Sequence, residues 1–114
     1  MANTFKNDTK SSLVTAAITD ASATVVTTGG TATLIVLSAI ASNKTGVSAD
    51  VDLYIDKSTG DDVYLIKNAP VPAGSSLELI SGNKVILESS DILQARCGTA
   101  TAIDLTVSYL EQTP

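Results

Sequence analysis

Apolar and polar residues alternate most clearly in the middle of the chain, over residues 49–57. A period of two places successive side chains on opposite faces of an extended strand, so that one face is buried and the other is solvated. Val51, Leu53 and Ile55 occupy one of these faces. The pattern therefore predicts a strand whose wet face carries Asp50, Asp52, Tyr54 and Asp56.

Similar short apolar runs recur about every ten residues and are separated by residues that favour turns. We expect the strand over 49–57 to form a hairpin with 63–67, and 75–80 to form a second hairpin with 84–88. The other strands are expected over residues 13–18, 23–28, 91–97 and 103–109. The expected core includes Leu53, Ile55, Leu65, Leu105 and Val107. No stretch has a sustained helical period, so almost no helix is expected.

The apolar run over residues 32–41 leaves no polar face, because Leu34, Ile35, Val36 and Leu37 are consecutive. One interpretation is a central strand that the domain itself buries on both sides. The other is a strand whose outer face is covered by a neighbouring subunit, since large exposed apolar patches mark interfaces. The sequence leaves both interpretations open.

The segment over residues 69–74 contains Pro70 and Pro72 and ends in a glycine. Proline fixes its own φ, keeps the preceding residue extended and cannot donate a hydrogen bond to a sheet. Prolines in sheets are therefore confined to edges and bulges. This segment is predicted to be an edge crossover between two sheets.

Short strands at this spacing predict an all-β fold, either an antiparallel β-sandwich or a jelly-roll-like barrel of about eight strands. The chain has 114 residues, which corresponds to one domain. The first ten residues are polar and are expected to be an N-terminal arm, or a short edge strand around Thr4–Asn7. Residues 11–114 are expected to form the β-sandwich domain.

The net charge of −5 and the seven scattered Lys and Arg residues argue against nucleic-acid binding, which requires a basic face. The apolar run over 32–41 is about half the length that a membrane span requires. The N-terminal residues lack the apolar core of a secretory signal. Cys97 is the single cysteine, so no intrachain disulfide is possible, which is consistent with synthesis in a reducing cytosol.

Candidate chemistry is sparse because the chain contains no histidine, the commonest general base and metal ligand. Cys97 is interpreted as a small buried apolar residue, with Arg96 on the opposite strand face. The acidic residues of the strand over 49–57 could in principle act as acid and base, but a solvated strand face explains them better.

Residues 56–62 superficially resemble a calcium loop, but the glycine comes one position too early and the terminal bidentate glutamate is missing. Gly29 and Gly30 lack the Lys-Ser/Thr of a phosphate-binding loop. We therefore expect no catalytic site, no cofactor and no metal.

Several segments together resemble a family of small virion structural proteins of tailed bacteriophages. They are V-D-L-Y at 51–54, A-P-V-P-A-G-S-S-L at 69–77, K-V-I-L-E at 84–88 with D-I-L at 91–93, V-S-Y-L-E at 107–111, and the start M-A-N-T-F-K-N. The similarity covers most of the chain from about residue 32 onward. Members of this family are often small β-sandwiches that decorate or cement the capsid, and the resemblance implies no catalytic residue.

The resemblance implies a capsid decoration or cement protein that binds the outer capsid and stabilises it through intersubunit contacts. Its expected partners are the major capsid protein or other virion proteins, and it is expected to form a homo-oligomer, with a trimer as one possible form. It would be made in the host cytoplasm and function in the virion. The candidate intersubunit contacts are Phe5, Leu34, Val36 and Ile40.

Two other roles are compatible with the same fold. One is a neck, tail or baseplate adaptor of the phage particle. The other is a carbohydrate-binding module, in which Tyr54, Tyr64 and Tyr109 would be the only rings large enough to stack on sugars.

Overall fold

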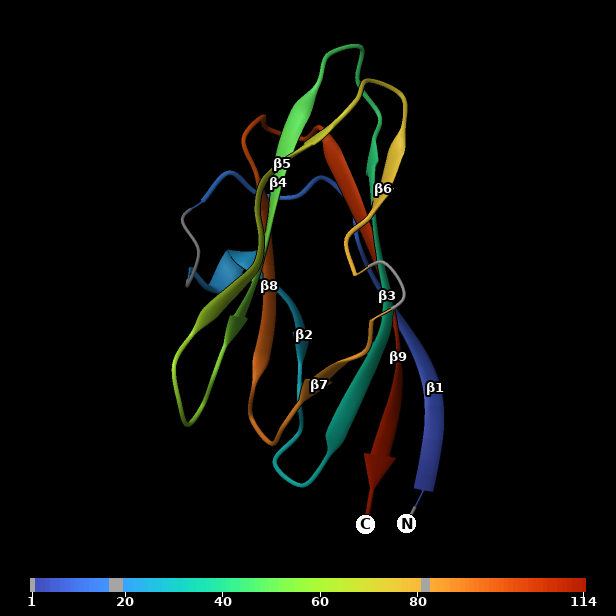
Figure 1. The fold of residues 1–114 in the computed structure, drawn as a ribbon, viewed down its shortest axis with the longest axis vertical. Helices are drawn as coiled ribbons and strands as arrows, with labels where there is room; N and C mark the ends of the chain where they lie inside the picture. The colour runs from blue at the N-terminus through green and yellow to red at the C-terminus, as the bar shows by residue number, and fades with distance from the viewer. Residues whose placement is uncertain (1, 17–19, 81–82) are drawn as a thin grey trace.

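Two antiparallel sheets pack face to face in the computed structural model, which describes residues 2–16, 20–80 and 83–114 (Figure 1). The five-stranded sheet has the order β1 (Ala2–Lys10), β9 (Ile103–Thr113), β3 (Thr33–Asn43), β6 (Ser76–Glu78), with β7 (Val85–Leu87) paired to another part of β3. The four-stranded sheet has the order β2 (Thr24–Thr27), β8 (Ile92–Cys97), β4 (Ala49–Asp56), β5 (Val63–Val71). The fold is thus the predicted all-β sandwich.

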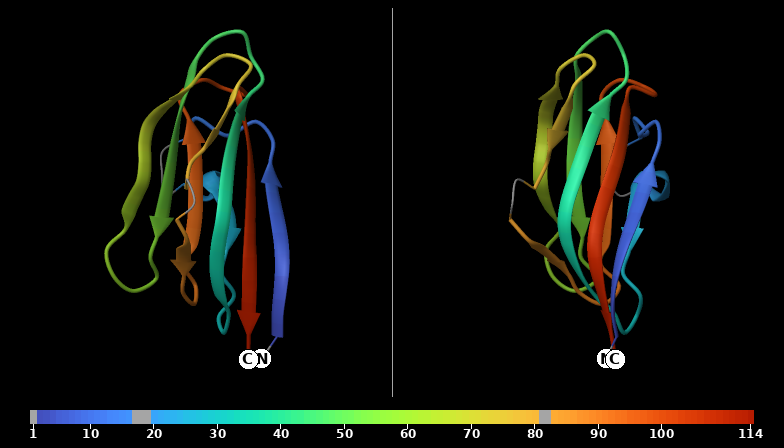
Figure 2. Two further views of the ribbon diagram at one scale, coloured as in Figure 1. Left: turned by 45° about the vertical axis from the view of Figure 1, so that its right-hand side comes forward. Right: turned by 90° about the vertical axis from the view of Figure 1, so that its right-hand side faces the viewer.

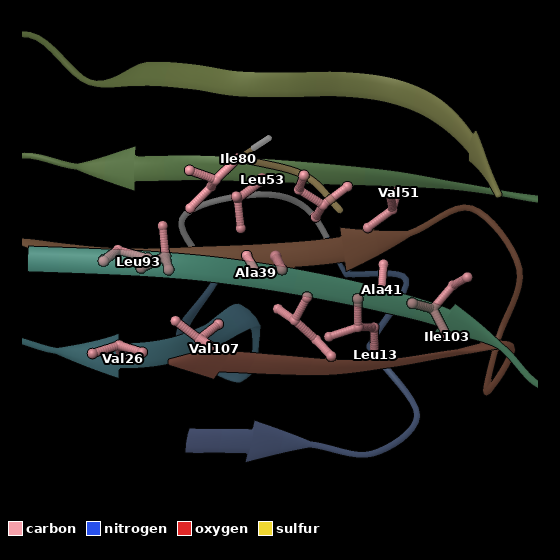
Figure 3. Close-up of a cluster of buried hydrophobic side chains, with 14 of the residues drawn as sticks. Leu13, Val26, Ala39, Ala41, Val51, Leu53, Ile80, Leu93, Ile103 and Val107 are labelled. Carbon is pink, nitrogen blue, oxygen red and sulfur yellow. The ribbon is translucent and has the colours of Figure 1, made fainter. Parts of the chain in front are cut away.

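The core lies between the two sheets and contains side chains from every second position of their strands (Figure 3). Leu53 and Leu93 enter it from the four-stranded sheet, and Leu105 and Val107 enter it from β9. All four of these side chains are fully or almost fully buried. Ile55 is also buried, whereas Leu65 is only partly buried at the margin of the core. The period-two pattern therefore identified the inward faces of β4 and β9 correctly.

Strand β3 lies at the centre of the five-stranded sheet, and only one of its faces is buried. Leu34 and Val36 point inward and are 1% and 0% exposed, so the domain's own core covers them. The prediction that these two residues contact another subunit is therefore wrong. Ile40 points outward and is 38% exposed, so burial of the strand on both sides is wrong as well.

The first residues of the chain belong to the sheet rather than projecting from it. Strand β1 pairs with β9 from Ala2 to Lys10 in one continuous antiparallel register (Figure 2). It is a longer edge strand than the one expected around Thr4–Asn7. Its polar sequence reflects this position, because an edge strand on the margin of the sandwich buries little of either face.

Residues 13–16, which were predicted to begin a strand, follow an irregular path between the two sheets. The backbone amide of Leu13 donates to the carbonyl of Ile103 at 2.7 Å, and the amide of Cys97 donates to the carbonyl of Val14 at 3.0 Å. The segment thus connects β9 to β8 with isolated hydrogen bonds instead of a ladder. The remainder of the predicted strand, residues 17 and 18, lies outside the described residues.

Of the two predicted hairpins, the first is correct and the second is wrong. Strands β4 and β5 pair directly, with register shifts near Leu53. Strands β6 and β7 instead pair with opposite ends of β3, at Ile40–Ser42 and at Leu34–Val36. The two short strands do not pair with each other because the long strand β3 offers each of them a separate partner. Residues 81 and 82 of the predicted turn lie outside the described residues.

The proline segment crosses between the sheets as expected. Pro70 lies in β5 at the edge of the four-stranded sheet, and the chain then enters β6 in the other sheet. Gly74 has a φ of +66°, a conformation that glycine adopts without strain. The turn is closed by the amide of Ser75, which donates to the carbonyl of Pro72 at 3.1 Å.

The two faces of β3 can be distinguished by substitution. We expect Leu34→Asp to unfold the domain, because it places an unpaired carboxylate in the core. Ile40→Asp on the outward face should leave a folded protein whose free energy of unfolding changes by less than about 1 kcal/mol. Thermal melting followed by circular dichroism measures both, and similar melting temperatures for the two variants would contradict the assignment of faces.

Candidate interaction surface

An apolar row crosses the outer face of the five-stranded sheet. Phe5 of β1 is the cross-strand partner of Leu110 in β9, Leu110 is the partner of Ile35 in β3, and Ile35 is the partner of Ile86 in β7. Directly opposed residues in an antiparallel sheet point to the same face, so these four side chains form one continuous line. With strands about 4.8 Å apart, the line is about 14 Å long. We call these four residues the apolar row.

The two ends of the apolar row are its most exposed parts. Phe5 is 77% exposed and Ile86 is 51% exposed, while Ile35 and Leu110 are half-buried between them. In the right-hand view of Figure 2, β3, β9 and β1 lie side by side in front, so that this face is turned toward the viewer. Exposed apolar side chains that are contiguous across several strands are typical of a surface that binds another molecule.

Uncharged polar residues flank the apolar row on both sides along β1, β9 and β3, whereas Lys84 and Glu88 flank Ile86 at the β7 end. One flanking row joins Asn3, Gln112 and Thr33, and the other joins Asn7, Ser108 and Ser38. The Asn7 side-chain amide donates to the hydroxyl of Ser108 at 3.4 Å. An apolar centre with uncharged polar neighbours resembles the core and rim of a protein interface, where charged residues are depleted at the core.

The predicted contact residues divide between the two sides of the five-stranded sheet. Phe5 belongs to the apolar row and Ile40 lies on the same outer face, whereas Leu34 and Val36 are in the core. Sequence reasoning missed the other three residues of the row, Ile35, Leu110 and Ile86. In β9 every second residue from Ile103 to Tyr109 faces inward, so the apolar Leu110 falls on the outer face. This break in the alternation could have identified Leu110 from the sequence. Ile86 stands in a strand of three residues, too short to show a period.

Asp52 does not lie on a wet face, which corrects the prediction for β4. It is 2% exposed, and its carboxylate accepts hydrogen bonds from the Arg96 guanidinium at 3.0 Å and from the backbone amide of Asn68 at 2.6 Å. Asn68 has a φ of +53° beside the irregular register of β5, a conformation that asparagine tolerates. Arg96 also donates to the carbonyls of Thr15 and Ala16. Asp52 therefore holds the irregular part of β5 directly and, through Arg96, the irregular segment at Thr15 and Ala16.

The Lys57 ammonium anchors the loop over 56–62, which superficially resembles a calcium loop. Lys57, at the start of the loop after β4, donates to Asp91 at 2.7 Å and to Glu88 at 3.0 Å. The Asp91 carboxylate also accepts from the amides of Ser58 and Glu88. Burial alone would raise the pKa of Asp91, but the Lys57 ammonium and the two amides outweigh burial and hold this pKa below its ordinary value. The same hydrogen bonds to Asp91 and Glu88 raise the pKa of Lys57.

Cys97 is buried, as predicted, with its Sγ 3.0 Å from the carbonyl oxygen of Thr99 and 3.2 Å from that of Leu13. Tyr109 is also buried, and its hydroxyl donates to the Asp8 carboxylate at 3.0 Å. Burial and this hydrogen bond raise the pKa of Tyr109 to about 12. Both contacts are structural: the first positions the segment over 13–16 and the second fixes β1 on β9.

Within residues 2–16, 20–80 and 83–114, no three side chains of the types that bind metals converge on one point. One surface hollow is lined by Ser, Thr, Ala, Leu and Val side chains over 12–16, at Ser22, and over 100–101. No helix in the described residues has the length and apolar character needed to cross a membrane.

No protein-family model matches this sequence, and no curated protein sequence matches it. A solved structure with a similar fold is the crystal structure of murine APRIL at pH 8.5. The alignment has 15% sequence identity and a TM-score of 0.42, and it covers 90% of this chain and 98% of the APRIL chain.

The buried position of Asp52 changes the expected cost of removing it. We expect Asp52→Ala to lower the free energy of unfolding by about 1–3 kcal/mol, because the Arg96 guanidinium and the Asn68 amide lose their acceptor. Asp50→Ala is the matched control, since Asp50 is two residues away in β4 and exposed; it should cost less than about 0.5 kcal/mol. Denaturant unfolding measures both, and equal costs would contradict the structural role of Asp52.

The lowered pKa of Asp91 predicts a dependence of stability on pH. The ionised carboxylate stabilises the fold above the pKa of the unfolded chain, about 3.9, and this contribution disappears as the pH falls through the lower pKa of the folded state. We expect Asp91→Asn to be less stable than the wild type at neutral pH and to lose less further stability between about pH 5 and pH 2. Asp61→Asn, at an exposed position, should follow the wild-type profile in urea unfolding.

Proposed function

We propose that this chain is a structural protein of a tailed-bacteriophage particle, a capsid decoration or cement protein without catalytic activity. In this role it binds the outer capsid surface and stabilises the shell by contacts between subunits. The observation that carries the proposal is the apolar row, which gives the outer face of the five-stranded sheet a contact surface. The resemblance of several sequence segments to small virion proteins supports the same role.

The physical argument concerns repetition. Apolar surface removed from water contributes roughly 25 cal/mol per Å², so four partly exposed side chains give a modest energy per contact. A standard interface buries about 800 Å² on each partner, more than the apolar row alone provides. Copies bound at many equivalent positions of a closed shell would each add such a contact, so their combined stabilisation of the shell is large although each contact is weak. A small sandwich with one exposed apolar row is suited to repeated attachment of this kind.

A neck, tail or baseplate adaptor of the particle is the second candidate, because such an adaptor would use the same face. The positions of the three tyrosines argue against a carbohydrate-binding module. Tyr54 and Tyr64 pack on each other edge to face, with ring centroids 4.9 Å apart, and the Lys67 ammonium lies 4.7 Å from the centroid of Tyr64. Tyr109 is 6% exposed. Tyr109 is therefore closed to sugars, and Tyr64, although 44% exposed, has its ring engaged by Tyr54 and Lys67.

Substitution at the β7 end of the apolar row tests the proposal. We expect Ile86→Asp to bind phage heads that lack the protein at least about tenfold more weakly than the wild type does, because it places a charge within the apolar contact. Val47→Asp is the matched control: Val47 is 61% exposed in a connection away from the row, so this variant should bind normally. Melting curves must show both variants folded.

The measurement is occupancy of purified heads and of purified tails against protein concentration. Saturable binding to heads that depends on Ile86 supports the decoration role. Binding to tails or necks alone would favour the adaptor. Failure of the folded wild-type protein to bind any part of the particle would refute the proposed function.

A further inference from the structure

Three of the four sheet edges in the sandwich are protected against pairing with another strand. Strand β2 has four residues and an irregular register, and β6 and β7 have three residues each. Strand β5 contains Pro70 and has two register shifts against β4. Short length, bulges and proline are the devices by which proteins prevent edge-to-edge association.

Strand β1 has none of these features. It has nine residues without proline or glycine and pairs with β9 without a register shift. Its two lysines do not guard the edge, because Lys6 bonds to Glu111 at 2.9 Å and Lys10 donates to the carbonyls of Ser22 and Thr24. A long, regular and unguarded edge presents a row of unpaired backbone donors and acceptors to a further strand. Figure 2 shows β1 at the margin of the sheet, next to β9 alone.

The open part of this edge is its first seven described residues. Residues 2–7 are exposed and Asp8 is partly buried. The bonds of Lys10 to Ser22 and Thr24 bring β2 beside the last residues of β1. A partner strand therefore has access to Ala2–Asp8, and Phe5 is the central residue of that span.

We propose that two copies of this chain associate edge to edge, with their β1 strands antiparallel and Phe5 opposite Phe5 at a twofold axis. This register pairs Ala2 with Asp8 and uses the whole open span. It also joins the two apolar rows end to end, so that one apolar line crosses the sheets of both copies. The flanking polar residues meet as well, because Asn3 lies opposite Asn7 of the second copy.

Other symmetric registers are less favourable. A twofold axis at Lys6 pairs Ala2 with Lys10, which lies beyond the open span and bonds to Ser22 and Thr24. An axis at Asn7 pairs Ala2 with Ser12, further beyond the point where β2 approaches. The Phe5 register avoids both problems. A contact of seven residues is smaller than a standard interface, so the dimer should depend on protein concentration.

This inference does not depend on the role in the phage particle, because it concerns the purified chain alone. The experiment is sedimentation velocity of the full chain at concentrations up to about 1 mM. We expect a monomer that converts to a dimer as the concentration rises. Phe5→Asp and Phe5→Lys should each weaken dimerisation at least about tenfold, because each places like charges opposite one another. Ile86→Asp is the control on the same row, far from the axis, and should dimerise like the wild type.

Mixing the two Phe5 variants tests the register itself. In the proposed register a Phe5→Asp chain and a Phe5→Lys chain form an oppositely charged pair, so their equimolar mixture should recover a heterodimer when neither variant dimerises alone. Phe5 is largely exposed, so melting curves should show both variants folded. A wild-type chain that stays monomeric at every concentration overturns the proposal, as does a dimer that Phe5→Asp leaves intact. A mixture of the two variants that stays monomeric overturns the Phe5 register. If the β1 edge instead binds only a strand of another protein, the wild-type chain stays monomeric, which also overturns the proposal.

Discussion

The pairing of β3 with β9 is the interaction on which the rest of the structure depends. The two strands align ten residue pairs although they lie about sixty residues apart in sequence. Strand β9 then carries β1 on its other side, and β3 carries β6 and β7 at its two ends. Successive residues alternate between faces on each side of the register shift between Val36 and Ser38. The pairing therefore decides both which side chains enter the core and which form the apolar row. A slip by one residue would expose Leu34 and Val36 and bury Ile35.

Buried polar side chains occur where the regular hydrogen bonding between strands is interrupted. Asp52 supports the irregular part of β5, Asp91 fixes the loop after β4, and Cys97 contacts the irregular segment before β2. Each group supplies hydrogen-bond partners to backbone that has left the sheet, so few unsatisfied groups are buried. These residues therefore serve the fold, although residue type alone would make them candidates for chemistry. Exposure and apolar character coincide on the outer face of the five-stranded sheet, and the proposed function rests on that face.

The outer face and the β1 edge are two parts of one surface that meet at Phe5. The row gives apolar area, and the edge gives unpaired backbone groups, so each supports a different kind of contact. Pairing of two β1 edges leaves the rest of the row, from Leu110 to Ile86, available on each copy. The proposed self-association and the proposed attachment to a larger particle are consequently compatible, and substitutions at opposite ends of the row would separate them.

The sequence by itself determined the class of fold, the hairpin between β4 and β5, and the proline crossover, because these follow from local periodicity and from the backbone limits of proline. Of the four contact residues that it predicted, Phe5 and Ile40 are exposed. It could not place Leu34 and Val36 correctly, because an apolar run without a polar face has no period to reveal which side meets the second sheet. Asp52 was misplaced for a related reason: alternation assigns a face, but whether that face is solvated depends on Arg96 and Asn68, which only the tertiary structure brings to it. The apolar row was likewise decided by tertiary structure, since its four residues come from four strands and become neighbours only through their registers.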